Sequence, residues 1–343
     1  MNHVLKAINK AVNNGYTFYA YRLPGDRLYH FSAAVVSCST STVISGFKVK
    51  PFNNDDAAVI IPEGISAYDF CLADVLQSRK IVPLNLLQTS RTEYNREFDA
   101  CLNLIRRGNL DKIVLSKVII CGNSNIDWGL TFQRMADAYP NAFVFIFNSP
   151  QTGAWAGASP ETLARYHGSS FSTMALAGTK PAANESTWGQ KEITEQEYVV
   201  KYLESVFRQC GVQFNKSEKT TVQAGSVKHL CNFFNAHVSS LSDAELLVEK
   251  LHPTPALCGL PTEIAKDAIC KIECNPRRCY GGYVGPFSPA GFDYFVNLRS
   301  MAFDNHSQAL FCGGGLTIDS IADDEWLETE TKALTMKNIL SLR

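Results

Sequence analysis

The sequence has no excess of either charge and no long apolar run, and these absences exclude several classes of protein. Its 343 residues carry 32 Lys and Arg against 33 Asp and Glu, so it lacks the basic surplus of a nucleic-acid binder. No run approaches the roughly 18 apolar residues of a membrane-spanning helix. The first twenty residues show neither a continuous apolar segment nor the small-residue cleavage site of a secretory signal. We therefore expect a cytoplasmic protein that binds neither nucleic acid nor membranes.

The sequence also lacks paired cysteine motifs. Its eleven cysteines include no Cys-x-x-Cys pair, which removes the commonest zinc-binding pattern. They stand singly within apolar segments, and we interpret them as reduced thiols of the core; examples are Cys101, Cys210, Cys231, Cys270 and Cys312. With 45% hydrophobic residues the chain can bury a large core, and no repeat, low-complexity tract or linker divides it. We expect one domain over residues 1–343.

The apolar pattern predicts a mixed α/β (α+β) fold with antiparallel strands. Four short apolar segments between residues 18 and 62 are joined by connections too short for helical crossovers. Helical spacing and capping signals predict helices over residues 2–13, 91–107, 130–138, 192–210, 242–251, 262–272 and 324–342. Alternation and turn signals predict further strands at residues 111–120, 142–147, 155–180, 227–238, 279–287, 293–303 and 309–318.

Residues 155–180 are the stretch around which we expect the site to be organised. They form a predicted hairpin or strand pair that begins with a Ser-Pro-Glu turn at 159–161 and ends in the small residues 177–179. Glu161 is either a surface turn residue or, inside a closed pocket near another negative group, an acid that retains its proton. In the second case it can donate that proton to a leaving hydroxyl.

Lys112 opens the strand predicted at 111–120. Alternation places it on the same face as Val114 and Val118. A lysine at the start of a strand is usually solvated, but enclosure by apolar neighbours would lower its pKa and leave an amine able to accept a proton. Lys112 is therefore a candidate base.

Two glutamates on predicted helices are candidate metal ligands. Glu195 shares a helical stripe with apolar residues, although it also fits a position near the positive end of the helix dipole. Glu328 lies four residues before Lys332, the spacing of a surface ion pair. Two inward carboxylates together with water and a substrate carboxylate would suit Mg²⁺, which prefers oxygen ligands.

Three further features admit two interpretations each. Arg299 lies within a predicted strand, where it pairs either with a structural acid or with a substrate carboxylate. The triplet 313–315 is either a tight strand passage or a place where backbone N–H groups approach an anion. His252, before Pro253, is a helix-end residue or a proton carrier.

Several segments of the sequence resemble those of a known enzyme family. Taken together and in this order, eight segments resemble the chorismate-utilising enzymes, and within them the isochorismate synthases: DKIVLSK (111–117), GASPETL (157–163), ALAGTKP (175–181), EITEQEYVV (192–200), LHPTPALCGLP (251–261), RRCYGGYVGPF (277–287), LRSMAF (298–303) and CGGGLTIDSIADDEWLETETK (312–332). The resemblance covers residues 93–343 and is specific as a set. The first ninety residues match the family poorly.

The resemblance implies large antiparallel sheets flanked by helices and a buried, Mg²⁺-dependent site that converts chorismate to isochorismate. Lys112 matches the lysine that activates water for attack at C2, and Glu161 matches the acid that protonates the departing C4 hydroxyl. Glu195 and Glu328 match the metal ligands. Positions that match the substrate pocket are Ala177, Gly178, Thr179, His252, Tyr280, Arg299, Gly313, Gly314, Gly315 and Lys332, of which Arg299 and Tyr280 match groups that hold the pyruvyl carboxylate.

The same resemblance separates reactions within the family. Anthranilate synthase subunits generally carry glutamine at the position of Lys112, and aminodeoxychorismate synthases typically carry lysine at that of Ala177. Both amination reactions are therefore disfavoured, and we expect no glutaminase subunit. Salicylate synthase shares Lys112 and the glutamates, so it stays open as an alternative, as does a non-catalytic chorismate-binding subunit. Menaquinone and catechol siderophore pathways are both compatible, and menaquinone is favoured.

Overall fold

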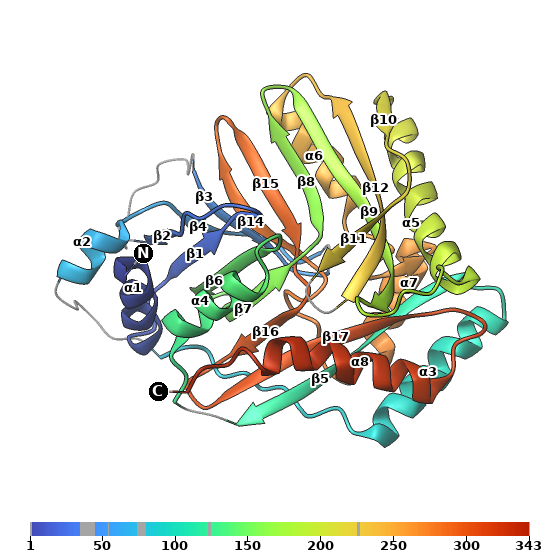
Figure 1. Ribbon diagram of the computed structural model, residues 1–343, viewed down its shortest axis with the longest axis horizontal. Coiled ribbons are helices and arrows are strands. Elements are labelled where there is room, and N and C mark those ends of the chain that lie inside the picture. The colour runs from blue at the N-terminus through green and yellow to red at the C-terminus, as the bar shows by residue number, and fades with distance from the viewer. Residues whose placement is uncertain are drawn as a thin grey trace.

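Two large antiparallel sheets flanked by helices form the structure, a computed structural model that describes residues 2–34, 45–53, 55–73, 80–122, 125–224 and 227–342 (Figure 1). The helices in this part of the chain are α1 (Asn2–Asn13), α2 (Ala67–Leu72), α3 (Arg91–Arg106), α4 (Trp128–Ala138), α5 (Gln190–Gln209), α6 (Leu241–Leu251), α7 (Thr262–Ile272) and α8 (Ala322–Lys337). None of the described helices is long and apolar enough to span a membrane.

The strands divide between the two sheets, and neighbouring strands are antiparallel throughout. The first sheet has the order β13 (Gly259–Leu260), β5 (Lys112–Gly122), β17 (Ser307–Leu316), β16 (Ser300–Phe303), β7 (Gly153–Ser159), β6 (Phe143–Ser149), β1 (Phe18–Arg22) and β2 (His30–Ala33). The second has the order β10 (Phe214–Lys216), β12 (Val227–His237), β9 (Ser170–Pro181), β8 (Thr162–His167), β15 (Gly291–Val296), β14 (Tyr283–Ser288), β3 (Gly46–Lys50) and β4 (Val59–Pro62), and β11 (Thr220–Ala224) also pairs with β12.

Strand β6 contributes side chains to two hydrophobic cores. Its alternate residues Phe143, Phe145 and Phe147 belong to the core shared by both sheets, whereas Val144 and Ile146 belong to the core beneath α1 and α4. Because successive side chains of a strand point to opposite faces, a strand covered on both sides is apolar at every position. A shared core agrees with the fold class expected from the sequence.

Among the places where the chain changes sheet, two are short crossings that lie next to each other, β7 to β8 and β15 to β16. Strand β7 pairs with β6 and β16, while β8 pairs with β9 and β15, so residues 159–161 form a crossing between sheets and not the turn of a hairpin. The segment 293–303, predicted as one strand, is likewise split into β15 and β16 of different sheets. Arg299 therefore lies in a crossing, at φ 48°, and the prediction that it is mid-strand was wrong.

The two crossings are hydrogen-bonded to each other. The Val296 amide donates to the Glu161 carbonyl over 3.0 Å, and the Ala158 amide donates to the Arg299 carbonyl over 3.2 Å. Backbone groups that leave a sheet ladder need new partners, and here each crossing supplies them to the other. The side chains of Glu161 and Arg299 are thereby held at the junction of the two sheets.

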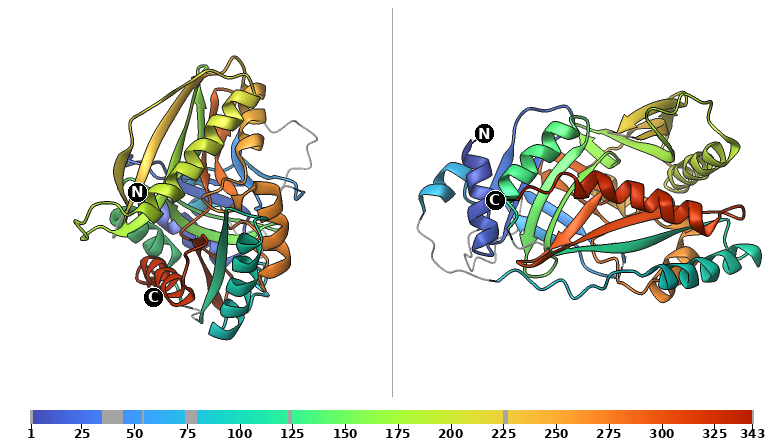
Figure 2. Two further views of the ribbon diagram at one scale, coloured as in Figure 1. Left: turned by 90° about the vertical axis from the view of Figure 1, so that its right-hand side faces the viewer. Right: turned by 60° about the horizontal axis from the view of Figure 1, so that its bottom comes forward.

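The helices were predicted with small errors at their ends. Helix α3 begins with a capping box formed by Ser90 and Glu93. The N-cap of α6 is Ser240, whereas the predicted helix began at residue 242. Helix α8 ends at Lys337 and not at residue 342. Figure 2 (right) shows α8 along β17, and α5 lies against β9 of the other sheet. Of the four apolar segments predicted as strands between residues 18 and 62, two, 29–36 and 42–49, lie partly outside the described residues.

The prediction of core thiols holds for only some cysteines. Every cysteine in the described part of the chain is free. Cys101, Cys231 and Cys312 are buried, but Cys210 and Cys270 are exposed. Both lie near the C-terminal ends of helices, where apolar neighbours in sequence do not guarantee burial.

A buried ion pair ties β5 to the loop that follows α6. The side chains of Arg277 and Glu273 are 2% and 4% exposed; Arg277 Nη2 lies 2.6 Å from Glu273 Oε1 and also donates to the Val114 carbonyl, and Nη1 donates to the Leu257 carbonyl. Glu273 in turn accepts from the Ser116 amide. This network fixes the backbone of two cavity-lining residues, Val114 and Leu257.

We predict that Arg277→Met destabilises the fold by about 3–5 kcal/mol, because it leaves the Glu273 charge buried without its partner. Arg208, whose side chain is 68% exposed and pairs with Glu204, is the matched control; Arg208→Met should cost less than about 1 kcal/mol. Urea unfolding followed by circular dichroism measures both values. Equal effects of the two substitutions would contradict the role given to the buried pair.

Candidate active site

A cavity lies at the junction of the sheets, where both crossings meet α5 and α8. It encloses about 770 Å³ of space not filled by atoms, part of it open to solvent. Most residues proposed from the sequence for the substrate, acid and metal sites line it: Glu161, Ala177, Gly178, Thr179, Glu195, Tyr280, Arg299, Gly313, Gly315 and Lys332. Side chains as far apart in sequence as Glu161 and Lys332 thus face one space.

Lys112 is fully buried beside this cavity. Its side chain is 0% exposed, and its Nζ donates to Glu195 Oε1 over 2.9 Å. A Cβ on Gly315 would lie 2.6 Å from Glu195 Oε1 and 2.8 Å from Lys112 Cε, so only glycine lets the two side chains meet over β17. Although burial raises the pKa of Glu195, Lys112 and other nearby ammonium groups outweigh it, and the net shift is downward.

Glu161 is a buried carboxyl that retains its proton near neutral pH. Its exposed fraction is 3%, and burial raises its pKa to about 8, although the positive charges of Lys112 and Arg299 act in the opposite direction. The surface-turn interpretation of Glu161 is therefore excluded. A protonated carboxyl facing a cavity can act as a general acid.

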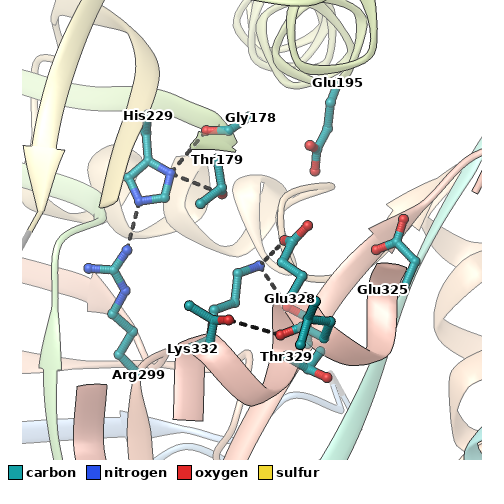
Figure 3. Close-up of polar contacts among 12 residues, drawn as sticks. Gly178, Thr179, Glu195, His229, Arg299, Glu325, Glu328, Thr329 and Lys332 are labelled. Carbon is teal, nitrogen blue, oxygen red and sulfur yellow. Dashed lines mark hydrogen bonds and ion pairs between the residues drawn. The ribbon is translucent and has the colours of Figure 1, made fainter. Parts of the chain in front are cut away.

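Arg299 and Tyr280 line the same cavity. Burial lowers the pKa of Arg299 to about 10, a value at which the guanidinium is still charged at neutral pH. The Tyr280 ring stacks on Phe311 with centroids 5.3 Å apart, and burial raises the pKa of its hydroxyl. Figure 3 shows the guanidinium directed toward the imidazole of His229. The cavity therefore offers a planar cation and a neutral hydroxyl, a combination suited to a carboxylate.

Glutamates of α5 and α8 lie at or beside the cavity. Glu328 Oε1 lies 2.7 Å from Lys332 Nζ, and Lys332 also donates to the Gly313 carbonyl. Burial opposes the charged form of Lys332, yet Glu328 and Glu195 outweigh it and raise its pKa. In Figure 3 the carboxylates of Glu195 and Glu328 approach from α5 and α8, and Glu325 lies one turn before Glu328.

Glu325 is 1% exposed, and its two carboxylate oxygens differ. Oε1 lies 2.8 Å from Lys191 Nζ and accepts from the Ser320 hydroxyl, whereas Oε2 is buried without a hydrogen-bond partner. Burial raises the pKa of Glu325, and Lys191 partly offsets this. An orphaned carboxylate oxygen beside two further glutamates fits a site for a divalent cation.

The carboxylates alone do not supply a full set of metal ligands. Among the described residues no group of three or more His, Cys, Asp or Glu side chains is placed to hold an ion by itself. Mg²⁺ usually takes one or two protein carboxylates and completes its six ligands with water and substrate oxygens. The donor set of Glu195, Glu328 and Glu325 fits such a shared site, and it does not fit a structural zinc site.

A family model described as chorismate binding enzyme matches residues 64–341. The chain belongs to this family. Isochorismate synthase EntC of Escherichia coli (strain K12) is 31% identical over 246 residues, which cover 68% of this chain and 63% of EntC, so the match spans less than two thirds of that relative's length.

Two solved structures share the fold. MenF, the menaquinone-specific isochorismate synthase of Escherichia coli, has a TM-score of 0.79 at 19% identity, covering 95% of this chain and 89% of MenF. Anthranilate synthase component I of Streptococcus pneumoniae TIGR4 has a TM-score of 0.66 at 14% identity, covering 94% and 90%. The predicted fold class, large antiparallel sheets flanked by helices as in chorismate-utilising enzymes, is confirmed.

Four of the residues proposed for the site of this chorismate-binding enzyme are not part of the cavity lining. Lys112 and Glu328 are each paired with a lining residue, Glu195 and Lys332. The other two are His252 and Gly314. His252 is the C-cap of α6; its Nε2 lies 3.1 Å from the Pro51 carbonyl and its ring packs edge-on against Tyr283. Burial lowers its pKa to about 3, so it is neutral. Gly314 faces α8, where a Cβ would lie 2.9 Å from Glu325 Oε2. The geometry favours the helix-end interpretation of His252 over a proton carrier.

Two residues of the site were missed by sequence reasoning. Glu325 lies three residues before Glu328 and seven before Lys332. Residues at this spacing share one face of a helix, so helical periodicity could have identified Glu325. His229 lies on β12 opposite Thr179 of β9. That pairing is a long-range property, and nothing in the local sequence around His229 indicates it.

We predict that the stability of Glu161→Gln relative to the natural chain depends on pH. Between the ordinary carboxyl pKa of 4.5 and about 8, the folded protein keeps a proton that the unfolded chain has lost, so the natural chain loses stability relative to glutamine by up to about 1.4 kcal/mol per pH unit. Above pH 8 the difference levels off. Thermal unfolding from pH 4.5 to 9, with exposed Glu218→Gln as control, measures it; parallel curves would contradict a raised pKa.

Proposed function

We propose that the protein is an isochorismate synthase, which converts chorismate to isochorismate by adding water at C2 and removing the C4 hydroxyl in the presence of Mg²⁺. The observation that carries the proposal is the protonated carboxyl of Glu161 facing one cavity with a guanidinium, near the buried amine of Lys112. The names of EntC and MenF support the reaction. We infer that the reaction serves menaquinone biosynthesis in the cytoplasm, with siderophore biosynthesis as the alternative.

Lys112 is the base of the proposed reaction. The ammonium group of Lys112 must first release a proton to solvent, and the resulting amine then accepts a proton from the attacking water. The ammonium ion that is formed again has an anionic hydrogen-bond partner, because Glu195 Oε1 lies 2.9 Å away. A buried ammonium without such a partner would be costly. The pair therefore lowers the free energy of the state that follows proton transfer.

Glu161 is the proposed acid. A hydroxide ion is a poor leaving group, so the C4 hydroxyl of chorismate must receive a proton as its bond to the ring breaks. A carboxyl with a pKa of about 8 carries that proton at neutral pH, and the nearby charges of Lys112 and Arg299 stabilise the carboxylate left behind. Base and acid together account for one water gained and one lost, so no redox cofactor is required.

The remaining groups bind the two carboxylates of chorismate. We assign the pyruvyl carboxylate to Arg299 and Tyr280, with the backbone around Gly313 beside them. A Cβ on Gly313 would lie 2.9 Å from the Tyr280 hydroxyl, so glycine leaves that hydroxyl accessible. Glu195 and Glu328, supported by Glu325, would hold Mg²⁺, which supplies positive charge for the ring carboxylate when bound.

The first test is product analysis by chromatography after incubation with chorismate and Mg²⁺. We expect isochorismate without pyruvate. Pyruvate and salicylate would assign the protein to the salicylate synthases, and binding without turnover would make it a chorismate-binding subunit. Lys112→Ala and Glu161→Gln should each reduce kcat by a factor of about 10² to 10⁴, the usual contribution of acid–base catalysis. The exposed Lys219→Ala is the control, and natural rates in either site variant would refute its role.

The proposed cation site has a separate test. Glu328→Ala should raise the Mg²⁺ concentration needed for half-maximal rate and weaken Mg²⁺ binding measured by calorimetry, because one of few protein ligands is lost. Glu197 lies on the same helix as Glu195 with its side chain 48% exposed, and Glu197→Ala should leave both values unchanged. An unaltered Mg²⁺ requirement in Glu328→Ala would remove Glu328 from the site.

A further inference from the structure

A β-bulge in the second sheet shapes the cavity wall around His229. In the pairing of β9 with β12, His229 is opposite Thr179 and Leu230 is opposite Ala177, so Gly178 is an extra residue in β9. Gly178 has φ 70°, and a Cβ there would lie 2.9 Å from the Glu192 carbonyl. Bulges of this kind redirect groups out of the ladder. The Gly178 carbonyl accordingly meets the imidazole of His229.

The partners of His229 determine which ring nitrogen carries the proton. Nδ1 lies 3.0 Å from the Gly178 carbonyl, which can only accept, so Nδ1 must be the donor. The Thr179 hydroxyl lies 3.2 Å from the same nitrogen. Nε2 lies 2.7 Å from Arg299 Nη2, which can only donate, so Nε2 must be the acceptor. Figure 3 shows these three contacts of the ring. They assign to His229 the neutral tautomer with its proton on Nδ1.

We propose that His229 is a positioning residue: its Nε2 lone pair holds the Arg299 guanidinium in the orientation that binds a carboxylate of the substrate. The inference rests on the proposed function for the identity of that substrate. Arginine has a long flexible side chain whose planar fork must be aligned to bind a carboxylate through two nitrogens. A hydrogen bond at one end of the fork fixes its plane before the substrate arrives.

A neutral acceptor suits this task better than a carboxylate would. An aspartate or glutamate at the position of His229 would also orient the guanidinium, but its negative charge would repel the incoming substrate carboxylate. An imidazole leaves the full positive charge for the substrate. Burial lowers the pKa of His229 to about 3, and the positive charges of Arg299 and Lys332 act in the same direction, outweighing Gly178 and Glu328. His229 thus keeps its lone pair at neutral pH.

Two conservative substitutions separate the contacts of His229. In His229→Gln the side-chain amide reaches the position of Nε2 and can present its oxygen to Arg299. In His229→Asn the shorter amide can reach the Gly178 carbonyl but leaves Arg299 without this acceptor. We expect His229→Asn to raise the KM for chorismate by about tenfold or more, the effect of losing one hydrogen bond to a charged group, with kcat changed much less. His229→Gln should restore most of that loss.

The exposed His237→Asn, at the end of the same strand, is the control and should have no effect. Equal KM values in the asparagine and glutamine variants, or a fall confined to kcat, would overturn the positioning role. If the natural chain does not turn over chorismate, the proposed function fails in a separate way, and the inference is then decided by a measurement that needs no substrate.

That measurement is nitrogen-15 NMR of the natural chain with labelled histidine. We expect His229 to show a protonated Nδ1, an unprotonated Nε2 and a coupling across the hydrogen bond to Arg299, unchanged between pH 5.5 and 8. A proton on Nε2, or titration within this range, would show that the imidazole cannot accept from Arg299 and would overturn the inference even if both variants failed to fold.

Discussion

The structure depends on the junction at which the chain passes twice between its two sheets. Each passage takes the backbone out of one ladder before it enters another, and the two passages satisfy each other through the Val296 amide and the Arg299 carbonyl. Glu161 and Arg299 extend from these passages into a space that no strand fills. An acid that keeps its proton and a guanidinium that keeps its charge are therefore products of the same topological feature.

Charged side chains around the cavity lie in pairs of opposite sign. The ammonium groups of Lys112 and Lys332 each have a glutamate partner, Glu195 and Glu328, so the carboxylates that would hold a cation are already paired with lysines. Binding of a divalent cation and of chorismate, a dianion, would add equal and opposite charge to this arrangement. Under the proposed function the charge balance of the site would be kept when both bind, which fits a cation held by few protein ligands.

Most helices and strands and several residues of the candidate site could be predicted from the sequence, because the signals for them are local. Alternation and capping signals located the helices and strands. The resemblance of several motifs to one family predicted that Lys112, Glu161 and Glu195 belong to one site, and the three side chains lie at or beside one cavity. The predictions that failed concern contacts between segments far apart in the sequence. Alternation shows that residues 293–303 are extended but not that they leave one sheet for another at Arg299. The register that sets His229 opposite Thr179 and the pairing of Glu325 with Lys191 depend on segments far apart in sequence.

The proposed function depends on the addition of water to chorismate, with Lys112 as base and Glu161 as acid. Running the reaction with Mg²⁺ in ¹⁸O-labelled water and examining the product by mass spectrometry tests this step. We expect isochorismate carrying one labelled oxygen, at the C2 hydroxyl. Isochorismate without label would show that the hydroxyl migrates within the substrate, and no isochorismate at all would show that the cavity serves another reaction.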